Sequence, residues 1–555
     1  MNEPIQKIFG IDLGTTYSSI AYVDEYGKPV IIPNLENQRV TPSVVFFDGS
    51  EIVVGDVAKE SAKLYPNEVV SFIKRSMGEP DFLFEYDGKA YRPEEISSFV
   101  LRKVAQDAEQ VIGKKIKDVV ITCPAYFGIN EREATRKAGE IAGFNVRQII
   151  NEPTAAAIAY GTFQDSENRV VLVYDLGGGT FDVTMIDIKD NSIDVICTGG
   201  DHNLGGKDWD DRIVAYLVQE FQKQTGSKED ILEDPDTWQD LQLSAEKSKK
   251  ILSQRDKTPV SITHGGERVK VELSRQKFLE ITEDLLERTV ALTHEMLGEA
   301  RKKGYEQFDE IILVGGSTRM PQIAERIRGE FNIEPRMFDP DEAVAKGAAI
   351  YGWKLSLNDG LIRRIAEKTN QDPEEGEKIM ESAPSNIMEE VAREMAEEAG
   401  ITLSAVKRSS SMKIQDVSSK SFGVVAKRPN GDEAVFNLIL RNTTVPVDTR
   451  RTFYTPEANQ ERVLIRIMEN ETSEKVVPTA YSVEIGTAVL ALPPGLPDDS
   501  PVDISFQLNR EGRLHITALE TTENRSVVAK IETRSVIHGK ELEEAKARSQ
   551  SLVVH

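Results

Sequence analysis

The chain contains little cysteine, and positive charge is scarce relative to negative charge. Its 555 residues include only 2 cysteines, Cys123 and Cys197, each inside an apolar, strand-like run. Two such thiols are expected to be buried core residues rather than a metal site or a disulfide, which fits a reducing compartment. The formal net charge of −24 argues against non-specific binding to nucleic acid or to an anionic membrane.

Long hydrophobic runs are also missing. No uninterrupted apolar stretch approaches the roughly 20 residues that a membrane helix needs, and the opening sequence, MNEPIQKIFGID, has no apolar signal core. These absences favour a cytosolic protein. With 39% hydrophobic and 29% charged residues the composition is globular, and the chain is too long for one hydrophobic core, so two or more domains are expected.

The most informative segment spans residues 170–188. A near-continuous apolar run, typical of a strand buried on both faces, ends at Asp175, and a turn with three glycines leads through Thr180 into an alternating strand. Glycines let the backbone turn tightly and point N–H groups at a phosphate. Asp175 suits a hydrated Mg²⁺, and Thr180 can contact a phosphate oxygen or a water. Taken alone, the segment is also compatible with an ordinary glycine-rich hairpin.

Residues 8–23 repeat this plan. An apolar strand is followed by Asp12, by Gly14, by two threonines and by an alternating strand. Two such hairpins in one chain indicate a duplicated domain that holds one polyphosphate from both sides. The repetition disfavours the ordinary hairpin.

Both hairpins resemble those of the ATPase superfamily that contains actin, sugar kinases and the 70-kilodalton heat-shock chaperones (DnaK-like). Further motifs favour the chaperones: IKR at 73–75, ITCPAYF at 121–127, IINEPTAAAIAYG at 149–161, LVGGSTRMP at 313–321 and PDEAVAKGAA at 340–349. The resemblance is nearly continuous from residue 8 to about 352 and resumes more weakly from 416 to about 533.

The resemblance implies a multidomain chain. An α/β actin-like (duplicated ribonuclease-H-like) nucleotide-binding domain in two lobes is expected over residues 5–355, and a β-sandwich peptide-binding domain over 413–535. Alternation supports the sandwich, because Val502, Ile504, Phe506 and Leu508 fall on one face before the NREG turn. The family's helical lid is expected to be missing, with only a truncated stub at 536–555.

Residues 356–412, a helical insert and linker, depart from the family pattern. Asn386 is expected to cap an amphipathic helix that stops at Gly400. A small insert packed on the ATPase lobes is the plain interpretation, and a partner-docking module is the alternative. In the linker, KRSSSMKIQ replaces the family's leucine run and leaves Met412, Ile414 and Val417 as apolar residues. Coupling between the domains is therefore expected to be rewired through the insert or weakened.

Phosphoryl transfer to water needs charge neutralisation and an aligned water molecule. By resemblance, Lys74 contacts the γ-phosphate, Asp12 and Asp175 hold Mg²⁺ through waters, and Glu152 and Asp182 complete an acidic ring; K⁺ is a further candidate cation. A surface lysine and a helix-capping carboxylate are the alternatives for Lys74 and Glu152. The expected phosphate cradle comprises Gly14, Thr15, Thr16, Tyr17, Gly177, Gly178, Gly179 and Thr180.

The adenosine end of the site is expected on a helix. Glu246, Lys249 and Ser253 are spaced so that one helical face presents all three to ribose and adenine, although polar helix faces often show this spacing. The family often has arginine where this chain has Lys250, so the nucleotide affinity is expected to differ. The remaining nucleotide-binding candidates are Gly315, Gly316, Ser317, Arg319 and Asp341, of which the arginine can stack on the base.

Four sandwich residues fall where the family lines its hydrophobic peptide groove: Val424, Phe453, Val463 and Ile465. A place in the sandwich core is an equally open interpretation of each.

Two positions that serve J-domain cochaperones in the family differ in this chain. Gly128 and Ile129 replace an Asn-Asp pair, and Gln148 replaces the arginine that precedes IINEP. Both changes argue against conventional J-domain stimulation.

These observations predict a cytoplasmic, lidless, ATP-dependent chaperone. It would hydrolyse ATP to ADP and phosphate with Mg²⁺, using Lys74 and Thr180 to position water, and bind extended apolar segments of unfolded clients. J-domain cochaperones and exchange factors are doubtful partners. The alternative is an ATP-binding scaffold or exchange-type cochaperone dedicated to one partner. A small-molecule kinase is disfavoured by the sandwich and by the lack of an evident sugar pocket.

Overall fold

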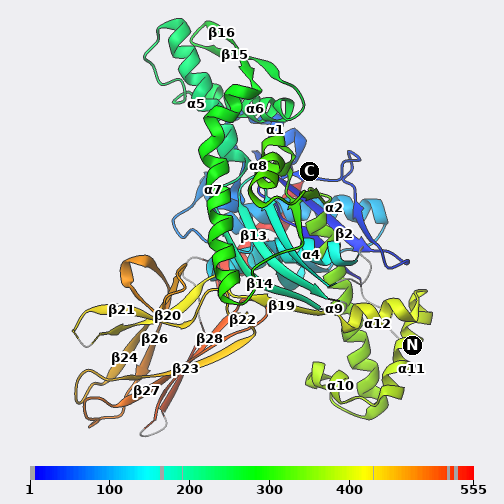
Figure 1. Cartoon of the computed structure of the whole chain (residues 1–555), viewed down its shortest axis with the longest axis vertical. Helices are drawn as coiled ribbons and strands as arrows, with labels where there is room; N and C mark the ends of the chain where they lie inside the picture. Colours follow the sequence, from blue (N-terminus) through cyan, green and yellow to red (C-terminus); the bar gives the residue numbers. More distant parts are fainter. Residues whose placement is uncertain (1–6, 163–167, 190–191, 429, 522–524, 531–535) are drawn as a thin grey trace.

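The computed structural model describes residues 7–162, 168–189, 192–428, 430–521, 525–530 and 536–555. Two α/β lobes form the centre of the molecule, a helical insert lies to one side, and a β-sandwich lies below the lobes (Figure 1). After the sandwich the chain returns to the lobes, where its C-terminal mark lies near helix α1 (Asp56–Ser61).

Each lobe is built on a mixed sheet, and the strand order is the same in both. The first sheet runs β3 (Pro29–Ile32), β2 (Tyr17–Val23), β1 (Ile8–Asp12), β10 (Asp118–Cys123) and β11 (Asn145–Asn151), with β4 (Thr41–Pro42) beside β2. The second runs β14 (Ser192–Asp201), β13 (Phe181–Lys189), β12 (Arg169–Leu176), β17 (Glu310–Val314) and β18 (Arg336–Met337). In both sheets an antiparallel hairpin pairs in parallel with the later strands. This repeat is the duplication that the two hairpins indicated.

Two helices rich in small residues, α4 (Glu152–Thr162) and α9 (Ala343–Thr369), pack in the common core of the two lobes. The approach is close enough to require glycine. A Cβ on Gly347 of α9 would lie 1.7 Å from the carbonyl oxygen of Ala155, and one on Gly10 of β1 would lie 2.2 Å from the amide nitrogen of Ala349. The backbones of both helices are thereby held at the strands that carry the hairpins.

Further elements of the first lobe surround its hairpin. They are β5 (Val45–Asp48), β6 (Glu51–Val54), β7 (Val69–Val70), η1 (Ile73–Ser76), β8 (Phe84–Tyr86), β9 (Lys89–Tyr91), α2 (Pro93–Ile112) and α3 (Ile129–Ile141). The second lobe adds α5 (Gly206–Thr225), α6 (Pro235–Leu252), β15 (Lys257–His264), β16 (Glu267–Ser274), α7 (Arg275–Lys302), η2 (Gly316–Arg319) and α8 (Pro321–Phe331).

The insert extends from the end of α9 and packs back on that helix. It contains η3 (Pro373–Glu375), α10 (Glu377–Ser382), α11 (Ser385–Ala399) and α12 (Leu403–Ser411). Val391 and Met395 are fully buried against α9, and Gly400 ends α11 with a left-handed φ of 69°, as predicted. The predicted cap at Asn386 is wrong. Helix α11 already begins at Ser385, because the carbonyl of Pro384 accepts the N–H groups of the first turn.

The linker forms a strand of the second lobe. Strand β19 (Lys413–Val417) pairs in parallel with β14 and antiparallel with β22 (Thr444–Val445) of the sandwich. Val417 is buried in the core between the lobes, and Met412 and Ile414 pack against it. The few apolar residues of the linker are therefore docked.

The sandwich has two antiparallel sheets. One contains β25 (Val476–Pro478), β21 (Glu433–Ile439), β20 (Ser421–Lys427), β24 (Arg462–Asn470) and β26 (Ser482–Ala491), with η4 (Thr479–Tyr481) before β26. The other contains β23 (Val447–Tyr454), β27 (Pro501–Leu508), β28 (Leu514–Glu520) and β29 (Arg525–Lys530). The four alternating apolar residues of β27 are all buried in the core, which confirms the predicted alternation.

The structure also bears on two features of the composition. Cys123 and Cys197 are buried, free thiols. Each helix of the described ranges is too short or too polar to cross a bilayer.

The contact of Gly10 with α9 predicts a stability difference between two alanine substitutions. Gly10→Ala should destabilise the protein by about 1–3 kcal/mol or more, because the added Cβ overlaps helix backbone. Gly329→Ala, in α8, has nothing within 4 Å and should stabilise by about 0.5–1 kcal/mol through helix propensity. Thermal unfolding measures both, and equal stabilities would contradict the close packing.

Candidate functional site

The turns of the two hairpins face each other directly. A Cβ on Gly178 would lie 2.4 Å from the Thr16 side chain, and one on Gly179 would lie 2.4 Å from the Thr15 side chain. The turn at Gly14 is fixed from its own lobe, because Ser43 Oγ donates to the Gly14 carbonyl at 2.8 Å. The glycine backbone of the second turn and the Thr15 and Thr16 side chains of the first turn therefore face each other across one narrow space.

Second-lobe elements fix the turn around Gly177. Ser317 Oγ donates to the Gly177 carbonyl at 2.8 Å, and the amide of Gly206 donates to the same oxygen at 2.9 Å. Gly315 has a φ of 84°, and a Cβ there would lie 2.4 Å from the carbonyl oxygen of Leu176. The glycines at 178, 179 and 315 allow approaches that side chains would block.

A ring of carboxylates, all buried except the partly buried Asp12, surrounds one buried lysine beside these turns. Lys74 Nζ donates to Glu152 Oε1 at 2.5 Å, and both side chains are nearly inaccessible to solvent. Asp12 accepts from Thr122 Oγ1 at 3.0 Å, and Asp182 accepts the amide N–H of Tyr126 at 3.1 Å. The predicted ring is therefore assembled, and Lys74 is not a surface lysine.

The ring carries more negative charge than its lysine can balance. Burial, together with the charge of Glu152, raises the pKa of Asp12 and of Asp182 to about 7. Burial and the neighbouring carboxylates raise the pKa of Asp175 well above its usual value. Burial opposes the charge of Lys74, but Glu152 and Asp12 outweigh it and raise the pKa of Lys74. A cation placed here would relieve this repulsion.

The residues present fit a hydrated Mg²⁺ and a polyphosphate. In the part of the chain that the structure describes, no three His, Cys, Asp or Glu side chains are grouped to hold a metal ion directly. Mg²⁺ commonly keeps several waters and contacts one or two carboxylates, which suits separated aspartates such as Asp12 and Asp175. The glycine turns supply N–H donors for phosphate oxygens.

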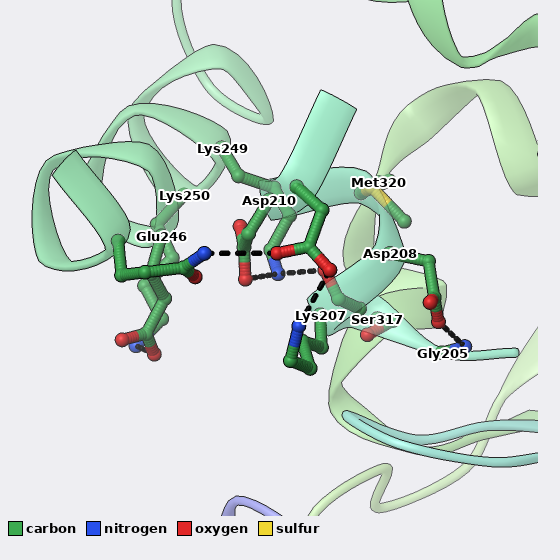
Figure 2. A network of polar contacts seen from close by, with 12 residues as sticks. Gly205, Lys207, Asp208, Asp210, Glu246, Lys249, Lys250, Ser317 and Met320 are labelled. Atoms are coloured by element: carbon green, nitrogen blue, oxygen red, sulfur yellow. Dashed lines mark hydrogen bonds and ion pairs between the residues drawn. The ribbon is translucent and has the colours of Figure 1, made fainter. Parts of the chain in front are cut away.

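Helix α6 presents the predicted adenosine-binding residues near the narrow space between the two hairpin turns, which is the cleft between the lobes. Lys249 Nζ donates to Asp210 Oδ2 and to the Gly206 carbonyl, each at 2.7 Å, and Figure 2 shows Ser317 nearby. Ser253 donates to the Lys249 carbonyl, so it ends the helix. Lys249 thus connects α6 to the first turn of α5, which rests on the glycine hairpin.

Lys250 takes part in a contact that crosses the cleft. Its Nζ lies 2.7 Å from Glu246 Oε1 and 2.9 Å from the Tyr17 hydroxyl, and Lys59 of the first lobe lies 2.5 Å from Glu246 Oε2. Burial opposes ionisation of Glu246, but Lys59 and Lys250 outweigh it and bring its pKa to about 2. The two lobes are therefore latched at the edge of the cleft by Tyr17, Lys59, Glu246 and Lys250.

The other predicted nucleotide-binding residues lie on the second lobe. Arg319 pairs with Asp341, and a Cβ on Gly316 would lie 3.1 Å from Asp341 Oδ1. Thr180 is buried at the end of its hairpin turn, where its carbonyl accepts the Gly177 amide at 3.0 Å.

Sequence reasoning missed several polar residues of this site. Arg75 donates to the Gly179 carbonyl at 2.8 Å and pairs with Asp208 at 2.5 Å, so it joins the first lobe to the second hairpin. Its position next to Lys74 in the IKR motif was the available signal. Lys59 and Asp210 lie in segments without a motif, and only the folded arrangement shows their roles.

The predicted peptide-binding residues divide into two pairs. Val424 and Ile465 are buried in the sandwich core, each only 2% exposed. Phe453 and Val463 are half-buried at the margin of that core. The guanidinium of Arg451 lies 5.5 Å from the Phe453 ring centroid, so a charged group borders the apolar margin.

Two side-chain connections join the acidic ring to the linker and the sandwich. Asn151, next to Glu152, donates to Asp416 of the linker at 2.8 Å. Tyr126, whose amide N–H binds Asp182, has Lys420 Nζ of the sandwich 4.0 Å from its ring centroid. Asn151, Tyr126 and Lys420 are buried, and Asp416 is partly buried.

The unusual residues at 128 and 129 also contact the sandwich. Glu469 Oε2 of β24 accepts the amide N–H of Ile129 at 3.1 Å, at the start of α3. A Cβ on Gly128 would lie 2.1 Å from Glu469 Oε1. Gln148 lies beside the sandwich as well, and its side chain donates to the Arg510 carbonyl at 3.4 Å. These departures from the family thus lie at the interface between domains.

The fold and the cleft together define a two-lobed nucleotide-binding protein joined to a β-sandwich. A family model described as Hsp70 protein matches residues 8–82, 79–360 and 378–553. The chain belongs to the Hsp70 family, whose members are ATP-hydrolysing chaperones. Residues 361–377, around the end of α9 and the start of the insert, lie outside the matched ranges.

Curated relatives agree with this family. The chaperone protein DnaK of Thermosipho melanesiensis is 37% identical over 528 residues, which cover 93% of this chain and 79% of the relative. That of Thermosipho africanus is 36% identical over 535 residues, which cover 94% and 80%. That of Thermotoga neapolitana is 38% identical over 530 residues, which cover 93% and 79%.

The Glu469 contact predicts that docking of the sandwich depends on pH. Burial, with the charge of Glu131, raises the pKa of Glu469 from 4.5 to about 7, although Lys420, the Ile129 amide and Arg132 oppose this. The docked state therefore binds more protons than an undocked state with an ordinary glutamate. Docking should be strongest below about pH 4.5 and weaken as the pH rises to about 7.

Fluorescence energy transfer between labels on the first lobe and the sandwich measures this dependence. Glu469→Gln should reduce the change in energy transfer between about pH 4.5 and 7 at least severalfold, because the amide cannot ionise. Glu484→Gln is the control, since Glu484 pairs with Arg466 on the exposed face of the same sheet. A Glu469→Gln profile that coincides with the unmodified one would contradict the prediction.

Proposed function

We propose that this Hsp70-family chain uses the residues of the acidic cleft to hydrolyse ATP and that the nucleotide state controls peptide binding by the sandwich. The observation that carries the proposal is the buried Lys74–Glu152 pair beside two facing glycine turns. Phosphate transfer to water requires a positive group and N–H donors fixed at the reacting phosphate. In this proposal, Lys74 and the two glycine turns fill these roles.

Each residue type has a role in this proposal. Lys74 contacts the γ-phosphate and, with Thr180, orients the attacking water. Asp12 and Asp175 would hold Mg²⁺ through waters, and K⁺ is a further candidate cation. When bound, Mg²⁺ would neutralise phosphate charge. The backbone and hydroxyl groups of the two hairpins hold the phosphates in place.

The adenosine end is proposed at the latch between the lobes. Glu246, Lys249 and Ser253 of α6 face the ribose and the base, and Arg319 supports the base from the other side. Because Lys250 pairs with Glu246 and Tyr17, we infer that its main contribution is to lobe closure rather than to stacking on adenine. A nucleotide that holds the lobes together would then keep the contacts among Tyr17, Lys59, Glu246 and Lys250 formed.

Coupling to the sandwich is proposed to run through the Asn151–Asp416 and Tyr126–Lys420 connections. A shift of Glu152 or Asp182 on binding of nucleotide would move Asn151 and Tyr126, which contact Asp416 and Lys420. The linker strand pairs with β14 at the same time, so lobe rotation changes a strand contact as well. Bistable packed elements of this kind transmit small shifts.

Peptide binding is proposed at the margin formed by Phe453 and Val463, with Val424 and Ile465 as its floor. The partners are extended apolar segments of unfolded polypeptides. J-domain cochaperones and exchange factors remain doubtful, because positions 128, 129 and 148 contact the sandwich in this chain. A cytoplasmic location is part of the proposal.

Removing the buried lysine tests the hydrolytic step. Lys74→Ala should lower the single-turnover rate of ATP hydrolysis by about 100- to 1,000-fold, because a preorganised positive group is lost. ATP binding, measured by calorimetry, should persist. Lys115→Ala is the control, since that side chain is 82% exposed. Hydrolysis at the unmodified rate would remove Lys74 from the mechanism.

A generic hydrophobic heptapeptide tests the chaperone role against the dedicated scaffold, which the relatives do not favour. Its affinity for the full-length protein should differ about 10-fold or more between ATP and ADP, a coupling free energy of roughly 1.4 kcal/mol or more. Fluorescence anisotropy measures both affinities. Indifference to the peptide in both nucleotide states would support the scaffold instead.

A further inference from the structure

The segment after the sandwich makes specific contacts with the first lobe. The amide of Ile537 donates to the buried carboxylate of Glu94 at 3.0 Å. Helix α13 (Gly539–Ser551) then buries Leu542 and Ala545 against Ile141 of α3. The first lobe thus provides both a buried polar partner and an apolar surface for this segment, residues 536–555.

Side chains of α2 hold the end of α13. Arg102 donates to the carbonyl oxygens of Ser549 and Leu552, the latter at 3.1 Å. Arg548 pairs with the buried carboxylate of Glu95 and lies 5.2 Å from the Tyr91 ring centroid. These contacts fix the point at which the chain leaves α13.

The chain then adds a strand to the first lobe. Strand β30 (Val553–Val554) pairs in parallel with β6, which is otherwise the edge of a sheet in the order β6-β5-β7. The amide of His555 donates to the Ile52 carbonyl at 2.8 Å, and the amide of Val54 donates to the His555 carbonyl at 2.9 Å. An open strand edge offers such groups to any extended chain.

Side chains in the added strand alternate between the lobe and solvent. Val554 is 8% exposed and belongs to the first-lobe core, with Leu552 packed against that core. Val553, between them, is 53% exposed. Backbone pairing together with a pocket for every second side chain is the general form of peptide recognition by strand addition.

We propose that the outer edge of β6 is a strand-accepting peptide site on the nucleotide-binding lobe, filled in cis by residues 552–555 of the same chain. Its ligand is a short extended segment with apolar residues at alternate positions. The site is separate from the margin of the sandwich around Phe453. Through it the chain ties the sandwich to the first lobe while β19 ties it to the second.

Tethering explains why the chain's own segment occupies the site. A tethered strand competes at an effective concentration in the millimolar range, so a free peptide of equal intrinsic affinity is excluded at micromolar concentration. Weakening the tethered strand should therefore open the site to a peptide in trans.

The test uses the full-length protein and a fluorescent peptide of sequence RSQSLVVH, residues 548–555. Val554→Asp places a charge in the buried pocket and should release the strand, so the apparent affinity for the peptide should rise by about 100-fold. Val553→Asp is the matched control, because that side chain faces solvent, and it should behave as the unmodified protein. A peptide carrying the Val554→Asp change should not bind any variant.

A second variant guards against misfolding of the first. His555→Pro removes the N–H that donates to the Ile52 carbonyl. The His555 side chain is exposed, so its replacement leaves the buried core intact. This variant should increase both peptide binding and hydrogen exchange of the Val54 amide, with nucleotide binding unchanged. Phe453→Asp, at the margin of the sandwich, should leave binding of the labelled peptide to the Val554→Asp protein unchanged, which separates this site from the sandwich.

Three results would overturn the proposal. They are equal peptide binding by the unmodified protein and both release variants, absence of binding by both release variants, and a dimer of the unmodified protein in light scattering that exchanges this strand between copies. Loss of heptapeptide binding by the sandwich would leave the β6 site unaffected, so failure of the proposed function is distinguishable.

Discussion

The structure depends on the placement of several carboxylates around a single buried ammonium group. Lys74 balances Glu152 directly, whereas Asp12, Asp175 and Asp182 remain without an equivalent positive partner. Such a cluster costs free energy in an empty protein and is retained because other packing holds its strands together. The duplicated sheets, and the close contacts of α4 and α9 across them, supply that packing. The same core therefore stabilises the fold and holds the carboxylates at positions where a bound cation would relieve their repulsion.

The repeated hairpin could be predicted from sequence because its constraints are local. Each hairpin carries its own short pattern, with glycines at 178 and 179 in one turn and threonines at 15 and 16 in the other. The structure then brings these two turns into contact. The alternation of β27 was equally readable, since one face of the strand is buried. In both cases the pattern can be recognised because its physical cause acts between residues close together in the chain.

Contacts between distant segments could not be predicted in this way. Lys59 and Asp210 act through partners far along the chain, and no local pattern marks a charged residue that a distant segment will cover. The cap of α11 was misplaced for a different, local reason: the carbonyl of Pro384 already accepts N–H groups of the first turn, so the helix begins before Asn386. Departures from a family pattern gave a partial signal, because Gly128 and Ile129 mark the place where Glu469 enters.

Attachment of the sandwich at several points has a consequence for how the domains separate. Linker strand β19 holds it to the second lobe, Glu469 and Lys420 hold it at the start of α3 and at Tyr126, and β30 holds the returning chain to the first lobe. Contacts that share one rigid sandwich are lost together, so the free energy of undocking is distributed among them. A change in nucleotide state that weakens the contacts nearest the acidic ring would therefore shift the balance towards undocking by the free energy lost at those contacts.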